Sequence, residues 1–278
     1  MPKLSSPHFP LAAHLFSATT YGGLAASTLE GTHPGRVLVD DLTRPRAALI
    51  CARAGVGYYF LAGEPDADFL SELHRCFLDD FVPAQKAALD NPEVLLFFPP
   101  GEGWQAALLE AFADCRPIVI RKKRFTLPAE AAQRLRARPI QPLGGLRLAP
   151  YTADLLAAQP EIGEEAALFY GSHESFLRHS LGACLLDGET LASHCHAVFT
   201  GAGEAEISIA TAPAYRRRGL AEIAAAAFIQ STFERGLAPI WGCWPENVPS
   251  VTLAGKLGFV EAADQPVLLW VDAEDWNR

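Results

Sequence analysis

The arginine-rich stretch Tyr215–Ala221 contains the residues whose types and spacing most clearly indicate chemistry. Its sequence, YRRRGLA, places three arginines directly before a glycine, at the start of a long alanine-rich segment. The first N–H groups of a helix have no partner inside the helix, and the helix dipole favours negative charge there. Glycine also lets the backbone approach a phosphate closely. The stretch therefore predicts an anion site, and a diphosphate fits several amides and guanidinium groups better than one carboxylate does. The alternative is a basic helix start packed against acidic neighbours.

The strand that precedes this stretch indicates where reactive groups would lie. Residues 204–212 alternate between apolar and polar side chains, which is typical of a half-buried strand. Ile207 and Ile209 fall on one face of the strand, while Glu206 and Ser208 fall on the other. Because burying a carboxylate is costly, we expect Glu206 to face a cleft rather than the core. A salt-bridged surface glutamate is the alternative.

The second half of the chain predicts the elements that position these residues. Residues 146–150 predict a strand, and helical segments follow to about residue 180. A helix is predicted at 219–235, because apolar residues recur on one side of it and Gly236 ends it. The other predicted elements are a hairpin of strands at 182–186 and 191–199, a strand at 239–244, a helix at 247–257, and two closing strands within 259–271.

The first half of the chain predicts a second α/β arrangement. Strands are expected within residues 46–63, at 93–100 and at 117–125, and helices are expected at 68–81 and 104–113. This alternation predicts a sheet covered by helices, without a glycine-rich phosphate loop or a catalytic constellation.

The stretch PIQPLGG, at residues 139–145, is typical of a linker between units. We therefore predict two domains. The first is an N-terminal α/β domain at residues 1–140, and the second is the domain at residues 141–278 that carries the arginine stretch.

Two ordered motifs in the second half resemble a known enzyme family. Arg216-x-x-Gly219-x-Ala221 follows an alternating strand and opens a helix. A strand comes next, followed by Asn247-x-x-Ser250-x-x-Leu253-x-x-Lys256-x-Gly258-Phe259. Together they resemble the signatures of the GNAT superfamily of N-acetyltransferases, over residues 146–271.

The resemblance implies a fold and an activity. The fold is a GNAT-type α/β (α+β) arrangement, with a mixed, mostly antiparallel sheet flanked by helices. The resemblance says nothing direct about residues 1–140, but their strand–helix–strand–helix order resembles the same fold without the phosphate motif, so we expect a smaller, degenerate GNAT-like domain there. The implied activity is an acetyl-CoA-dependent N-acetyltransferase in which a primary amine attacks the thioester directly. The alternative is a catalytically weak or inactive protein of this fold that binds acetyl-CoA as a sensor or scaffold.

The resemblance also implies which residues contact acetyl-CoA. The pyrophosphate would lie on the backbone amides of Arg217–Ala221, and the pantetheine arm would pair with the backbone at Ile209–Ala212. Asn247 and Ser250 would face that arm from the last helix, although a plain helix cap is the alternative for Asn247. The predicted cofactor-binding residues are Ile209, Ala210, Thr211, Ala212, Arg216, Arg217, Arg218, Gly219, Leu220, Ala221, Asn247 and Ser250.

Acyl transfer to an amine needs a base for the amine, donors for the developing oxyanion and a thiolate that leaves. Glutamates near the position of Glu206 serve as bases in relatives, so the resemblance makes Glu206 the candidate base, directly or through a water. A backbone N–H near Ala210 would be the oxyanion donor.

The general acid is less clear from the sequence. Many relatives carry a tyrosine where this chain has Ala254, directly after the leucine aligned with Leu253. Ser250, which we assign as the second catalytic residue, Cys243 and Tyr170 are the candidates to replace it.

The sequence predicts no metal site. His194 and His196 lie two apart on a predicted strand, which is a weak spacing for metal ligands, and no third ligand lies nearby in sequence. Lining an acceptor pocket is another role for this pair. The six cysteines form no Cys-x-x-Cys pair, so we interpret them as buried free thiols.

Charge limits the classes of partner. The net charge is −9, and residues 141–278 hold 8 basic and 17 acidic side chains, against 15 of each in residues 1–140. Such acidity disfavours nucleic acid and favours a small cationic amine acceptor, such as a polyamine, an aminoglycoside or an amino-acid amine. The basic run at 116–138 lacks interleaved aromatic residues, so we interpret it as solvated surface.

No apolar run approaches the length of a membrane span, and the N-terminal residues are a poor signal peptide. We therefore expect a cytoplasmic protein without a membrane partner, and the sequence leaves a homodimer open.

Overall fold

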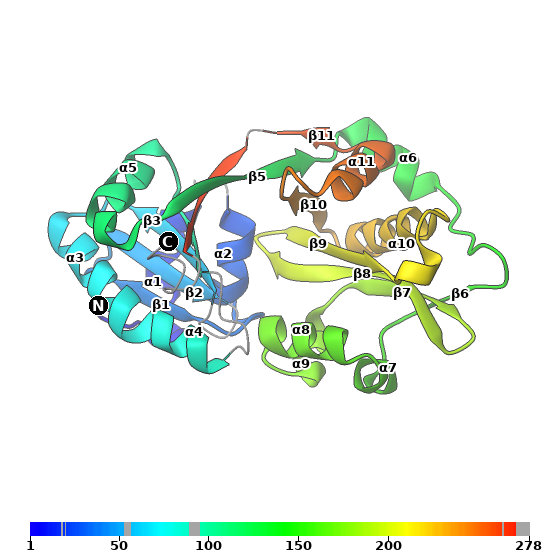
Figure 1. Ribbon diagram of the computed structural model, residues 1–278, viewed down its shortest axis with the longest axis horizontal. Helices are drawn as coiled ribbons and strands as arrows, with labels where there is room; N and C mark the ends of the chain where they lie inside the picture. The colour runs from blue at the N-terminus through cyan, green and yellow to red at the C-terminus, as the bar shows by residue number, and fades with distance from the viewer. Residues whose placement is uncertain (18, 20, 53–56, 89–94, 263, 271–278) are drawn as a thin grey trace. The chain divides into compact units, whose positions relative to one another are not determined.

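The computed structural model describes residues 1–17, 19, 21–52, 57–88, 95–262 and 264–270. The chain divides into two units (Figure 1). Unit 1 comprises Met1–Arg121, Leu168–Gly171 and Gln265–Arg278, and unit 2 comprises Lys122–Ala167 and Ser172–Asp264. In the part of the chain that the structure describes, no helix has the length and apolar character to span a membrane.

Unit 1 contains a mixed sheet with the strand order β1-β2-β3-β4-β12. β1, β2 and β3 are antiparallel neighbours, β3 and β4 run parallel, and β12 is antiparallel to β4. The strands are β1 (Arg36–Val39), β2 (Ala47–Ala52), β3 (Tyr58–Gly63), β4 (Leu95–Phe98) and β12 (Gln265–Trp270). The helices are α1 (Pro10–Phe16), α2 (Gly22–Leu29), α3 (Ala67–Cys76), α4 (Val82–Ala88) and α5 (Glu102–Ala111), with short turns η1 (Ser6–His8), η3 (Phe77–Phe81) and η4 (Ala113–Cys115).

Helix α3 shows why this sequence folds as it does. Asp66 precedes the helix, and its carboxylate accepts a hydrogen bond from the backbone N–H of Phe69 at 2.9 Å, which caps the first turn. The apolar stripe then continues through Leu73 and Phe77 into the π-helical turn η3. These buried side chains join an aromatic core in which the Phe97 ring lies 4.8 Å from the Trp270 ring, centre to centre.

Unit 2 contains a second mixed sheet, with the order β5-β10-β9-β8-β7-β6 and the short strand β11 beside β5. β6 to β9 are antiparallel neighbours, β9 and β10 run parallel, and β5 is antiparallel to β10. The strands are β5 (Ile118–Thr126), β6 (Arg147–Ala149), β7 (Gly182–Asp187), β8 (Thr190–Gly201), β9 (Glu204–Thr211), β10 (Ala238–Cys243) and β11 (Val260–Glu261). The helices are α6 (Ala129–Ala137), α7 (Ala153–Ala158), α8 (Pro160–Tyr170), α9 (His173–His179), α10 (Leu220–Glu234) and α11 (Val248–Leu257), with the turn η5 (Pro213–Tyr215).

The predicted mixed, mostly antiparallel sheet flanked by helices is confirmed. Helix α10 packs on β7, β8 and β9 (Figure 1), and its buried alanines let it lie close to that sheet. Ile207 and Cys195 belong to the same core cluster as α10, as the alternation of β9 predicted.

Two strands lie in a different sheet from the one that their sequence position suggested. β12 pairs with β4 of unit 1, so one of the two closing strands predicted for the second half belongs to the first sheet. β5 passes from unit 1 into unit 2, where Phe125 pairs with Trp241 of β10. The units consequently divide at Arg121–Lys122 rather than near residue 140, because the pairing of β5 with β10 outweighs the linker-like composition of residues 139–145.

The two units repeat one order of elements. In each, antiparallel strands lead to a parallel pair joined through helix, which is β3-α3-η3-α4-β4 in unit 1 and β9-α10-β10 in unit 2. A further helix follows, α5 or α11, and then a strand that joins the other unit's sheet, β5 or β12. This repetition is what a degenerate copy of one fold predicts.

A buried polar cluster lies on the face of β8 that is opposite to α10. The Tyr151 hydroxyl lies 3.0 Å from Nδ1 of His194 and 3.4 Å from Nδ1 of His196. A side chain at Gly182 would place its Cβ only 2.5 Å from the Tyr151 ring, so glycine is required there. Burial lowers the pKa of His196 to about 4, and burial together with the neighbouring His196 lowers that of His194 to about 4. Both imidazoles are therefore neutral near pH 7.

These two histidines should make the protein sensitive to mild acid. Their pKa in the unfolded chain is near 6.5, so below that pH the unfolded state binds protons that the folded state does not. Stability is therefore lost as the pH falls from about 6.5 toward 4. We expect a loss on the order of 2 kcal/mol per histidine between pH 7.5 and 5, measured as the free energy of urea unfolding.

The matched control is a histidine outside the cluster. His196→Gln should flatten the dependence of unfolding free energy on pH, whatever it does to stability at pH 7.5. His8→Gln changes an exposed histidine and should leave that dependence unaltered. An unchanged slope in His196→Gln would contradict the assignment.

Candidate functional site

A groove with a cavity volume of about 910 Å³ opens in unit 2 beside the start of α10. The end of β9, the first turn of α10 and helix α11 form its walls. The predicted residues that line it are Ile209, Ala210, Thr211, Arg216, Arg217, Gly219, Leu220, Ala221, Asn247 and Ser250. The structure thus brings most of the predicted cofactor-binding residues to one place, although they come from three separate elements.

The groove exists because β9 and β10 separate. Their parallel pairing runs from Ala238↔Glu204 to Ile240↔Glu206, whereas β10 continues to Cys243 with β5 on its other edge. Beyond Glu206, the described residues of β9 pair with β8 alone. The outer edge of Ile209–Thr211 is thereby left to the groove, and an extended chain can pair with such an edge.

The start of α10 has an open backbone. Gly219 is its N-cap with φ +79°, and the helix has no side-chain cap. A Cβ at Gly219 would meet no protein atom within 4 Å, so the space above the first turn is unfilled. Arg217 also has a positive φ, +62°, which is uncommon for a residue other than glycine and is often found at functional sites. The first N–H groups of α10 are therefore available to an anion.

The three arginines have different roles. Arg216 and Arg217 line the groove, and Nε of Arg216 donates to the carbonyl of Thr211 at 3.2 Å, which ties the loop to the end of β9. Arg218 instead lies over the Tyr215 ring at 5.3 Å and is not part of the lining. Ala212 is also outside the lining. For these two predicted residues the structure shows no place in the groove wall.

Helix α11 supplies the opposite wall. Asn247 caps it, because its Oδ1 accepts from the backbone N–H of Ser250 at 3.2 Å, and Asn247 lines the groove as well. The Ser250 hydroxyl accepts a hydrogen bond from Nε1 of Trp241 at 2.9 Å. The same hydroxyl also forms a hydrogen bond with the side chain of Cys243.

Several lining residues were not predicted from the sequence. They are Tyr215, Glu222, Val248, Pro249, Thr252, Leu253 and Lys256. Pro249, Thr252, Leu253 and Lys256 recur at spacings of three and four, so the helical period of α11 was the signal that would have grouped them with Asn247. The groove carries net positive charge, because its lining includes Arg216, Arg217 and Lys256 but only one carboxylate, that of Glu222. Glu222 also forms an ion pair with Arg138 at 2.8 Å.

Glu206, the predicted base, lies where β9 and β10 begin to separate and is not part of the groove lining. Its side chain is 7% exposed, and Oε1 accepts a hydrogen bond from Nζ of Lys122 at 2.7 Å. A Cβ at Gly242 would come within 2.7 Å of the Lys122 side chain and 2.9 Å of Oε1, so a small residue is required there. We expected Glu206 to face a cleft, with a salt-bridged surface glutamate as the alternative, whereas the structure shows a buried carboxylate in an ion pair. Its partner Lys122 lies 84 positions away in sequence, which no local pattern indicated.

The residues considered as general acid are spread apart. Ala254 lies on the buried face of α11 and is fully buried in the core. Tyr170 belongs to unit 1 and packs on His33 with ring centroids 4.2 Å apart, so it does not line the groove. Cys243 is buried, which raises the pKa of its thiol. Of the candidates, Ser250 alone lines the groove.

Comparison with known proteins identifies the family of the chain. The family described as GNAT acetyltransferase matches residues 13–267 of the chain. The sequence is 28% identical over 237 residues to the uncharacterized N-acetyltransferase YdfB of Bacillus subtilis (strain 168), which covers 84% of each protein.

Two solved structures show that the likeness extends over both units. A GCN5-related N-acetyltransferase-like protein from Streptococcus suis superimposes with a TM-score of 0.68 at 23% identity, covering 95% of this chain and 99% of the other. A tandem GNAT protein from the clavulanic acid biosynthesis pathway has a TM-score of 0.62 at 13% identity, covering 97% of each chain. The predicted family, fold and enzyme class are thereby confirmed: the chain belongs to the GNAT acetyltransferase family, whose members are N-acetyltransferase enzymes.

Proposed function

We propose that this protein transfers an acetyl group from acetyl-CoA to the primary amine of a small cationic acceptor. The observation that carries the proposal is the groove itself. It joins an open strand edge at Ile209–Thr211 to an uncapped helix start at Gly219, with Arg216, Arg217 and Lys256 beside it. An elongated ligand fits this groove, with an extended arm along the strand edge and a diphosphate at the helix start.

The residues present fit acetyl-CoA as a substrate. The open space above Gly219 accommodates a phosphate close to the backbone, and the helix dipole and two arginines offset its charge. The separated edge of β9 offers backbone groups to the amide-bearing pantetheine arm. Ala212 and Arg218 then contribute to the shape of the loop rather than to the groove wall.

The net charges of the two structural units support a cationic acceptor less strongly than the net charges of the two sequence halves did. Unit 2 holds 13 basic and 15 acidic side chains, a net of −2, whereas unit 1 holds 10 and 17, a net of −7. The acceptor argument therefore rests on local carboxylates. Glu165 accepts a hydrogen bond from Ser208 at 3.1 Å, and Ser208 shares a strand face with Glu206.

In the proposed reaction the acceptor nitrogen forms a bond to the acetyl carbon as the carbon–sulfur bond breaks. Glu206 takes the amine proton, directly or through a water, while the hydrogen bond from Lys122 orients its carboxylate. A backbone N–H near Ala210 stabilises the developing oxyanion. The sulfur leaves as a thiolate, which accepts a hydrogen bond from the Ser250 hydroxyl and takes its proton from water.

One observation favours a second candidate, a protein that binds acetyl-CoA as a sensor or scaffold. Position 254, where many relatives have a tyrosine, is a fully buried alanine, so the usual acid is missing. A wild-type protein that binds acetyl-CoA but turns over no amine would favour this candidate. The proposed small-molecule acceptor, the cytoplasmic location and the homodimer stay predictions.

The acetyl-CoA groove is tested by Gly219→Glu. The new carboxylate would stand where the pyrophosphate is proposed to bind, so repulsion and blocked access should weaken binding. We expect at least a tenfold rise in Kd, about 1.4 kcal/mol or more, in a calorimetric titration with acetyl-CoA.

Gly236→Glu is the matched control for that titration. Gly236 follows the other end of α10, has φ +73° and also has no protein atom within 4 Å of a built Cβ. The two variants therefore share backbone strain and added charge, and differ in which end of the helix carries it. Equal weakening in both, or no binding by the wild type, would contradict the proposed groove.

The base is tested by Glu206→Gln, assayed by thiol release with acetyl-CoA and a panel of polyamines, aminoglycosides and amino-acid amines. The amide keeps the shape of the side chain but takes up no proton, so we expect kcat to fall about 10²- to 10⁴-fold. Acetyl-CoA affinity, measured by calorimetry, should change little.

Glu204→Gln is the control for the base. Glu204 lies on the same strand and face, two residues farther from the groove, and burial raises the pKa of its carboxyl. It should retain most of the activity. If Glu204→Gln lost activity and Glu206→Gln kept it, the assignment of the base would be wrong while the groove proposal stood.

A further inference from the structure

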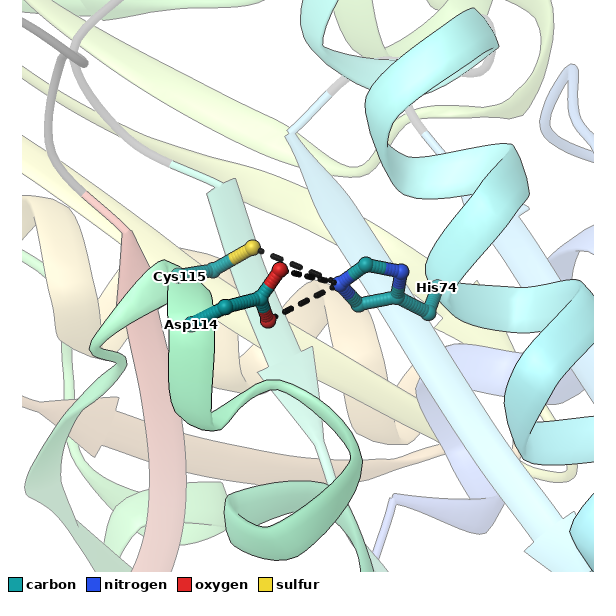
Figure 2. Close-up of side chains that lie close together, drawn as sticks. All are labelled: His74, Asp114 and Cys115. Atoms are coloured by element: carbon teal, nitrogen blue, oxygen red, sulfur yellow. Dashed lines mark hydrogen bonds and ion pairs between the residues drawn. The ribbon is translucent and has the colours of Figure 1, made fainter.

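Three side chains of unit 1 with metal-binding atoms converge at one point (Figure 2). Nε2 of His74 lies 3.0 Å and 3.1 Å from the two carboxylate oxygens of Asp114 and 3.6 Å from Sγ of Cys115. All of these ligand atoms lie within 4.8 Å of one another. Within the described ranges of the chain, no other set of three such residues meets this condition.

The fold holds the three side chains from two directions. His74 lies in the last turn of α3, and its ring is 5.1 Å from the ring of Phe112, centre to centre. Asp114 and Cys115 form the end of the turn η4, directly after α5. Both helices belong to the buried core of unit 1, so the distance between the two sides of the cluster is set by packing rather than by the cluster itself.

The geometry does not fit a catalytic triad. In a nucleophile–base–acid relay the cysteine and the carboxylate engage different nitrogens of the imidazole. Here both meet the same nitrogen, Nε2. Burial, and the nearby Asp114 carboxylate, raise the pKa of the Cys115 thiol to about 11, and the residue is only 4% exposed. A protonated, covered thiol is a poor nucleophile.

The same geometry does fit a shared metal ion. Zinc binds imidazole nitrogen at about 2.0–2.1 Å and thiolate sulfur at about 2.3 Å, so tetrahedral angles place those two atoms roughly 3.5 Å apart. The observed separation is 3.6 Å. A nitrogen and a carboxylate oxygen on one such ion would be roughly 3.3 Å apart, close to the observed 3.0 and 3.1 Å.

We propose that His74, Asp114 and Cys115 bind a thiophilic divalent cation, with Zn²⁺ as the physiological occupant. Nitrogen, oxygen and sulfur ligands together suit zinc, whereas Mg²⁺ and Ca²⁺ prefer oxygen ligands alone. Three protein ligands leave the fourth tetrahedral position to solvent. Asp114 is 65% exposed at its side chain, which gives the ion a route in.

The site extends the known properties of this chain, because it lies in unit 1 and uses no residue of the groove. Its physical effect is to link the end of α3 to the end of α5. An ion bound only by the folded state adds to the free energy of unfolding. Unit 1, whose helix α3 begins with a capped first turn, would thereby gain a stabilising centre instead of a substrate site.

The test uses the full chain without a polyhistidine tag, stripped with a chelator and titrated with Co²⁺. We expect one Co²⁺ per chain, with a thiolate-to-cobalt charge-transfer band in the near ultraviolet and the strong visible bands of tetrahedral cobalt. Zn²⁺ should displace both signals. Cys115→Ser should abolish the charge-transfer band, and Asp114→Asn should weaken binding by at least the roughly 10- to 100-fold typical of lost supporting contacts.

Cys76→Ser is the matched control, since Cys76 is the partly exposed thiol at the end of α3 but is not in the cluster. It should leave both signals unchanged. Asp114→Asn keeps the test valid if Cys115→Ser misfolds, because Asp114 is exposed and its replacement should not disturb folding. The absence of a charge-transfer band in wild type, its survival in Cys115→Ser, or its loss in Cys76→Ser would each overturn the proposal.

Discussion

The separation of β9 from β10 is the constraint on which the candidate site depends. The two strands pair only as far as Ile240↔Glu206, although β10 continues through Trp241–Cys243, where its other edge pairs with β5. This fork exposes one edge of β9 and leaves space beside the start of α10. The ion pair of Lys122 with Glu206 lies at the same fork, and only a residue as small as Gly242 leaves room for it.

The repeated unit shows how a similar arrangement of elements loses its anion site. In unit 2 the helix after the parallel-pairing strand begins at Gly219 with an uncapped first turn. In unit 1 the corresponding helix, α3, begins after Asp66, whose carboxylate already accepts from the backbone N–H of Phe69. Asp66 also forms an ion pair with Arg46, whose Nη2 lies 3.1 Å from its Oδ2. An anionic ligand would therefore meet a backbone donor and a guanidinium group that a carboxylate of the protein already occupies at that helix start.

The sequence predicted local elements well and distant partners poorly. Alternation in residues 204–212 and the helix beginning at Gly219 both have the predicted form, because each depends on neighbouring residues. The partners of β5 and β12 were not foreseen, since an apolar strand such as Gln265–Trp270 fits either sheet by pattern alone. In the same way, Lys122 and Glu206 are 84 positions apart, and His74 is about 40 positions from Asp114 and Cys115, so no spacing rule applies to either contact. Those contacts are set by the packing of the whole unit.

The exchange of β5 and β12 also bears on how the chain acquires its structure during synthesis. The sheet of unit 1 ends with β12, whose Leu268 pairs with Phe97 of β4, about 170 residues earlier. A ribosome makes all of unit 2 before it makes that strand, so the first sheet keeps an open apolar edge throughout. Because such an edge invites pairing with other chains, we infer that the newly made N-terminal half depends on protection until the last strand arrives. The N-terminal half made alone therefore lacks one strand of its own sheet, despite the clear internal repetition.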